Sequence, residues 1–126
     1  MFSADPTASA ELTFPAGIVG LPELTRFTVR TVNDSIVELV SLDDPTFGLI
    51  AIPGERARPG LGELLRGLEL AGSDEEVLVV LSTHGEPPVV TANLAGPLVV
   101  AADGVARQLV VEHPELDLRA PLPGAG

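Results

Sequence analysis

The chain has 126 residues, 45% of them apolar, which is enough for one domain around one hydrophobic core. Its 18 acidic and 7 basic residues give a net charge of −11 at pH 7, which disfavours direct binding to nucleic acid or to an anionic membrane surface. Cysteine is absent, so disulfides and thiolate metal sites are excluded.

The first half of the chain predicts short strands joined by turns. Polar and apolar residues alternate over 11–14 and 25–32, residues 36–42 are expected to form the returning strand, and a further apolar strand is expected over 47–52. Turn residues at 33–35 join the second and third strands into a hairpin. Two glycines and two prolines between 15 and 22 predict a fixed turn without regular structure. Residues 1–10 are expected to form a flexible N-terminal tail.

The second half predicts one helix followed by more strands. Residues 53–59 are expected to be a loop, and leucines at helical spacing predict a helix over 61–68. The continuous apolar run 77–81 is typical of a strand that is buried on both faces or closes a barrel. Further strands are expected over 89–94, 97–101 and 105–112, the last two joined by a hairpin turn at Asp103-Gly104.

Many short strands with one late helix predict an all-β fold, a small antiparallel β-barrel-like domain with one short helix. The domain is expected to span residues 11–122, with a flexible C-terminal tail at 123–126. The N-terminus lacks the basic start and apolar run of a signal peptide, and no apolar stretch is long enough to span a bilayer. We therefore expect a cytoplasmic protein.

No pattern of residues indicates catalysis. His84 and His113 have no carboxylates or second histidine at metal-ligand spacing, and a nucleophile elbow, a phosphate-binding loop and a calcium-binding loop are all absent. We predict that the protein is not an enzyme and has no catalytic residues, metal or cofactor.

Acidic turns are the candidates for contact with a partner. A strongly acidic surface attracts a basic protein, although acidic turns are more commonly just solvated. The hypothesis is that reversing the charges of Asp74 and Glu75 together weakens binding without unfolding the domain. The candidate partner-binding residues are Asp43, Asp44, Pro45, Thr46, Asp74, Glu75, Glu76 and Glu112.

The segment from Thr91 to Val100 contains an asparagine, two small residues and a proline between two apolar strands. Together with the 14–20 segment upstream and Gln108 downstream, this segment resembles the FliW family of flagellar assembly factors over roughly residues 11–122. Leu21, where the family usually has an aromatic residue, and Gly96, where it has a larger one, depart from the family pattern. The residues that carry the resemblance are Phe14, Gly17, Gly20, Thr91, Asn93, Leu94, Pro97 and Gln108.

The resemblance implies a small β-barrel-like protein without enzymatic activity or cofactor. It implies that the protein binds newly made flagellin, as a chaperone does, and also the basic translational repressor CsrA. Partner switching between the two would oppose the repression of flagellin mRNA translation by CsrA. The matching glycines, Asn93 and Pro97 are expected to hold the fold more than to touch a partner. The alternatives are a small-molecule-binding β-barrel and a structural interaction module.

Overall fold

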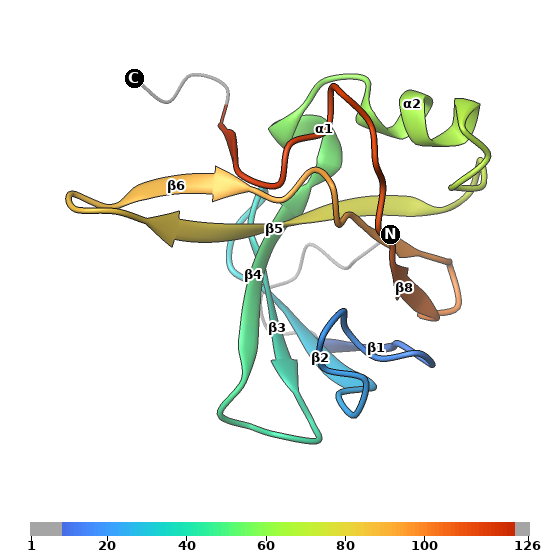
Figure 1. Cartoon of the computed structure of the whole chain (residues 1–126). Helices are drawn as coiled ribbons and strands as arrows, with labels where there is room; N and C mark the ends of the chain where they lie inside the picture. Colours follow the sequence, from blue (N-terminus) through green and yellow to red (C-terminus); the bar gives the residue numbers. More distant parts are fainter. Residues whose placement is uncertain (1–8, 123–126) are drawn as a thin grey trace.

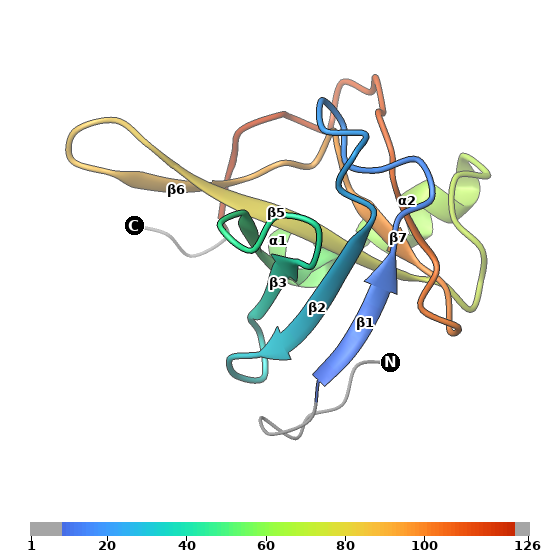
Figure 2. The same cartoon turned by 90° about the horizontal axis from the view of Figure 1, so that it is seen from below.

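A computed structural model describes residues 9–122, which form an antiparallel sheet with two short helices (Figures 1 and 2). The all-β, barrel-like prediction is confirmed, but the described residues contain two helices instead of one. The strands are β1 (Ser9–Thr13), β2 (Arg26–Thr31), β3 (Val37–Ser41), β4 (Gly48–Pro53), β5 (Glu76–His84), β6 (Val89–Ala92), β7 (Leu98–Val100), β8 (Ala106–Gln108) and β9 (Ala120–Pro121), and the helices are α1 (Gly54–Ala57) and α2 (Leu61–Gly67).

The sheet curves until its first and last barrel strands meet. Neighbouring strands pair antiparallel in the order β1, β2, β3, β4, β5, β7, β8. The Thr13 N–H then donates to the Gly104 carbonyl at 2.9 Å, and Thr13 bridges to Val105. This contact nearly closes a barrel and covers the end of the β1 edge that an open sheet would expose. Asp103-Gly104 makes the predicted hairpin turn between β7 and β8.

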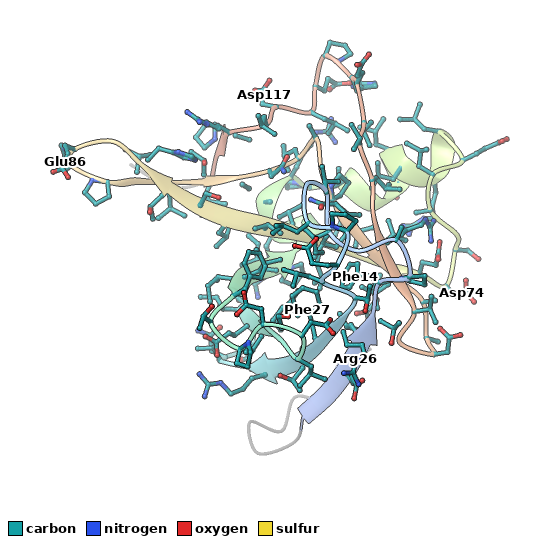
Figure 3. The ribbon with its side chains drawn as sticks, turned by 60° about the horizontal axis from the view of Figure 1, so that its bottom comes forward. Phe14, Arg26, Phe27, Asp74, Glu86 and Asp117 are labelled. Carbon is teal, nitrogen blue, oxygen red and sulfur yellow. The ribbon has the colours of Figure 1, made fainter. Side chains whose placement is uncertain are left out.

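Strand β5 separates two hydrophobic clusters. Its even-numbered residues, such as the buried Leu78, face the barrel interior, and its odd-numbered residues, such as the buried Val79, face the helices. Successive side chains of a strand point to opposite faces, so one continuous apolar run serves both clusters. The run 77–81, predicted to be buried on both faces or to close a barrel, thus packs on both faces, with Leu78 and Val79 buried. The rings of Phe14 and Phe27 meet edge to face at 5.5 Å inside the barrel (Figure 3).

Helix α2 is stabilised mainly by its neighbours, because seven residues with two glycines make a weak helix alone. Leu61 and Leu65 are fully buried in the second cluster. The Glu55 carboxylate of α1 accepts hydrogen bonds from the N–H groups of Gly60 and Gly62, at 2.9 and 2.8 Å. These are N–H groups that the start of a helix leaves without a partner. The loop predicted over 53–59 is therefore wrong, since α1 occupies 54–57 and supplies this cap.

Strands β5 and β6 continue beyond the barrel as a hairpin (Figure 1). The part of β5 after Leu81 pairs with β6 and not with β4, and Val89 on β6 is 55% exposed. Glu86 lies at the tip of this hairpin, far from the barrel core (Figure 3). The prediction of a strand over 77–81 was thus too short, because polar residues after Leu81 remain in a strand exposed to solvent.

Several other boundaries differ from the prediction. Strand β1 begins at Ser9, so part of the expected tail is sheet, whereas residues 1–8 and 123–126 lie outside the described residues. Strand β8 ends at Gln108 because the chain then bonds to the 95–97 turn, with Leu109 N–H donating to Pro97 O. The two-residue strand β9, which pairs with β6, was not predicted, since two residues carry no periodicity.

Candidate functional site

The turn between β3 and β4 contains the first predicted acidic pair. The Asp43 carboxylate accepts hydrogen bonds from the N–H groups of Thr25 and Arg26, at 2.9 and 3.0 Å, and these bonds lower its pKa. The Thr46 hydroxyl and N–H both donate to Asp44 and lower the pKa of that carboxyl. Asp43, Asp44, Pro45 and Thr46 are all exposed. The turn is accessible, but both carboxylates already stabilise its conformation.

The second predicted acidic group lies between α2 and β5. The Arg107 guanidinium donates two hydrogen bonds to the Glu75 carboxylate, at 2.8 and 3.1 Å, and a third to the Leu70 carbonyl. Arg107, followed by the Gly72 N–H, holds the pKa of Glu75 below its ordinary value. The Glu75 side chain is only 17% exposed, whereas Asp74 is exposed. A lysine at position 75 would face Arg107, so the double charge reversal would also disturb the fold.

The predicted acidic residues do not form one face. The 43–46 turn lies at the lower end of the molecule in Figure 1, whereas the loop carrying Asp74 lies at the far right. Figure 3 likewise places Asp74 at the edge opposite the hairpin tip. Glu112 is exposed in a third segment, after β8. Which of these residues contact a partner stays a prediction.

The residues that carry the family resemblance meet in what we call the Gln108 corner, formed by the 14–22 loop, Asn93, Gly96 and Gln108. The Gln108 amide accepts from the Val19 N–H at 2.9 Å and donates to the Gly96 carbonyl at 3.1 Å. Asn93 accepts from the Gly96 N–H at 2.9 Å. Three segments far apart in the sequence are thus tied by side-chain amides.

The remaining motif residues support the same region of the fold. Phe14, Leu94 and Pro97 are buried, and the Leu94 N–H donates to the Asp117 carbonyl. Thr91 is half-buried and pairs with Pro121 of β9. Most of the motif residues are therefore buried or half-buried, and that they hold the fold stays a prediction.

A side chain at Gly17 would collide with the turn that this loop makes. Gly17 has φ = 74°, and a Cβ there would lie 2.5 Å from the Cα and carbonyl oxygen of Pro22. Gly20 also has positive φ, at 82°, but a Cβ there would meet no atom within 4 Å. Both positions favour glycine by conformation, and only Gly17 requires it for space.

A groove of about 440 Å³ lies between the β2–β3 turn, the two helices and the start of β5. We call it the acidic groove. Buried Val37 and Leu78 lie among its apolar residues. Sequence reasoning did not identify it, because its charges come from four separate segments and only the fold brings them together. Its charged residues are Asp34, Glu55, Glu63, Arg66, Glu75 and Glu76.

Within residues 9–122, no group of three or more acidic or histidine side chains is arranged to hold a metal ion. His113 accepts a hydrogen bond from the Glu115 N–H through Nδ1, and His84 is half-buried at the end of β5. In the same part of the chain, neither helix is long and apolar enough to cross a membrane.

The chain matches known flagellar proteins along almost its whole length. The model of the family described as FliW protein matches residues 3–122. The chain is 29% identical over 121 residues to "Flagellar assembly factor FliW 2" of Desulfotalea psychrophila (strain LSv54 / DSM 12343), covering 89% of this chain and 80% of the relative. It is 30% identical over 116 residues to "Flagellar assembly factor FliW" of Geotalea uraniireducens (strain Rf4), covering 85% and 71%.

A solved structure titled "Crystal structure of the flagellar assembly factor FliW" shares the fold. Its TM-score is 0.73 at 21% identity, over 92% of this chain and 88% of that one. Together with the family match over residues 3–122, the barrel and the Gln108 corner agree with the resemblance found in the sequence. The chain belongs to the FliW family of flagellar assembly factors.

Proposed function

We propose that this protein binds flagellin and the translational repressor CsrA in the cytoplasm. By switching between these partners, it would antagonise the repression of flagellin mRNA translation by CsrA. Membership in a family of flagellar assembly factors supports a role in flagellum biogenesis. The roles as flagellin chaperone and CsrA antagonist come from the resemblance and are part of the proposal, as is the absence of catalysis.

The net charge of −11 is the observation that carries the proposal of a basic partner. All seven basic residues are arginines, and within residues 9–122 three of them form ion pairs with acids, Arg30 with Glu38, Arg58 with Glu115 and Arg107 with Glu75. An acidic surface steers a basic protein toward it and raises the association rate. It also repels RNA, so the protein would act on the repressor and not on the message.

Titration with purified CsrA and flagellin, alone and in competition, tests the proposal. We expect a complex with each, mutual competition, and a CsrA affinity that falls as salt rises from 50 to 500 mM. A preformed complex of CsrA with flagellin leader RNA should release its RNA when the protein is added. Direct displacement and allosteric release both predict this result, and a reciprocal coupling between RNA and protein affinities identifies the allosteric route. Absence of binding to both proteins contradicts the proposal.

The acidic groove favours one alternative, a protein that binds a small molecule. Its volume falls within the range of about 300–1,000 Å³ that is usual for ligand pockets. The barrel interior offers no support, because Leu12, Phe14 and Phe27 are at most 1% exposed there. A ligand screen by thermal shift, with native mass determination, distinguishes this alternative from protein binding.

A further inference from the structure

The acidic groove combines an apolar floor with an excess of negative charge on its rim. Five carboxylates and one guanidinium line it. Val37 and Leu78 are buried beneath it, and Val77 is half-buried. Such a surface can hold a ligand that has apolar and cationic parts close together.

Three of these carboxylates, Glu55, Glu75 and Glu76, already interact within the fold. Glu75 pairs with Arg107, and Glu55 accepts the N–H groups at the start of α2. Within residues 9–122, by contrast, Asp34 and Glu63 make no hydrogen bond or ion pair, and both are exposed. They lie on different elements, Asp34 in the β2–β3 turn and Glu63 on α2. A ligand that engages both must reach across the groove.

The single cation of the groove does not cancel this charge. Arg66 lies beside Glu55 and contributes to lowering the pKa of that carboxyl. The ends of both side chains would lie within 3.3 Å of a Cβ on Gly62. Arg66 is thus close to a carboxylate that the backbone also engages, and Asp34 and Glu63 supply unbalanced negative charge.

We propose that the acidic groove binds an extended basic segment of a partner protein, with arginine or lysine side chains at Asp34 and Glu63. The aliphatic stems of these side chains would cover Val37, Val77 and Leu78, since long basic side chains bury their methylene groups while their charged ends stay hydrated. The net negative charge of the groove favours a positively charged ligand. The proposal rests on the proposed function, because it names the surface that a basic protein partner would use.

A peptide of four Arg-Ala repeats tests the groove directly, with isothermal titration and amide chemical shifts as readouts. We expect shifts at residues 33–37, 62–66 and 76–78. Replacing Asp34→Asn and Glu63→Gln together should weaken binding about tenfold. The matched control, Glu11→Gln with Glu23→Gln, removes the same two charges from exposed positions outside the groove and should weaken binding less than about twofold. An equal loss of peptide affinity in the two double variants would overturn the proposal that the groove binds the peptide. Chemical-shift changes confined to other residues would overturn it too.

A Gln-Ala peptide and spermidine identify the ligand class. The Gln-Ala peptide should not bind measurably. Spermidine should bind more weakly than the Arg-Ala peptide, and binding as tight as the peptide's would overturn the assignment to a protein segment. Unchanged unfolding midpoints of all variants confirm that they fold.

Titration with CsrA separates the groove from the proposed function. If the groove variant (Asp34→Asn with Glu63→Gln) binds CsrA more weakly and the control variant does not, the result supports both the groove and the proposed function. If CsrA binds the groove variant as tightly as the wild type, the groove is overturned while the proposed function stands. If CsrA and flagellin do not bind the wild type, the proposed function fails, and the peptide measurements still decide whether the groove binds basic segments.

Discussion

The Gln108 corner and the acidic groove use their polar side chains in opposite ways. In the corner, the amides of Asn93 and Gln108 form hydrogen bonds within the fold, with the backbone of Gly96 and Val19. In the groove, Asp34 and Glu63 make no hydrogen bond or ion pair within residues 9–122. The motif residues of the corner thus make hydrogen bonds inside the fold, and the two groove carboxylates without a partner in this part of the chain lie outside that motif.

Gly17→Ala should have the largest effect on stability. The new Cβ needs both a left-handed backbone and space that Pro22 occupies, so we expect a loss of about 3 kcal/mol in the free energy of unfolding. Gly20→Ala is the matched control, since it has the same backbone cost without the collision, and should lose about 1 kcal/mol. Urea denaturation measures both, and equal losses would show that the close approach to Pro22 does not matter.

Gln108→Met should cost about 1–2 kcal/mol, because it keeps the length of the side chain but leaves the Val19 N–H and the Gly96 carbonyl without their partner. Val110→Gln changes a side chain that is 76% exposed two residues away, and should alter stability by less than about 0.5 kcal/mol. A neutral result for Gln108→Met would mean that packing alone holds the corner together.

Glu75→Gln should lower stability by about 1 kcal/mol, because the bidentate pair with Arg107 ties β8 to the loop before β5. The adjacent Asp74→Asn removes the same charge from an exposed side chain and should stay within about 0.5 kcal/mol of the wild type. Urea unfolding of the two variants compares a carboxylate that is paired with Arg107 with an exposed neighbour. Equal stability of the two variants would contradict a structural role for the pair.

Acid should weaken the fold through the carboxylates whose pKa is lowered. The pKa of Glu55 and that of Glu75 lie below the ordinary 4.5 in the folded state, so the stability they contribute is present above pH 4.5 and is lost as pH falls through the lower folded values. Glu55→Gln should therefore reduce the slope of stability against pH below 4.5. A slope identical to that of the wild type would contradict the role of Glu55 in capping α2.

Asp34→Asn with Glu63→Gln should have the smallest effect on the fold, within about 0.5 kcal/mol, since neither carboxylate has a partner within residues 9–122. The same double substitution is expected to have a large effect on binding. A clear loss of stability would show that these groove carboxylates, like Glu75, have a structural role.

The sequence predicted most strands, the Asp103-Gly104 turn and the packing of 77–81 on both faces, because each depends on local periodicity or turn chemistry. It did not predict α1 or β9, which are too short to show a period and are fixed by contacts such as Glu55 with Gly60. Glu75 looked like its neighbour Asp74, and only the position of Arg107, 32 residues away, separates the two. The acidic groove was missed for the same reason.

Strand β5 has a consequence for how the molecule comes apart. The alternate side chains of β5 belong to the barrel cluster and to the helix cluster. Loss of β5 would therefore disrupt both clusters at the same time. The domain should therefore unfold cooperatively as one unit. Amide hydrogens at 78–80 should exchange with solvent only when the whole chain opens, whereas those at the hairpin tip should exchange through local fraying.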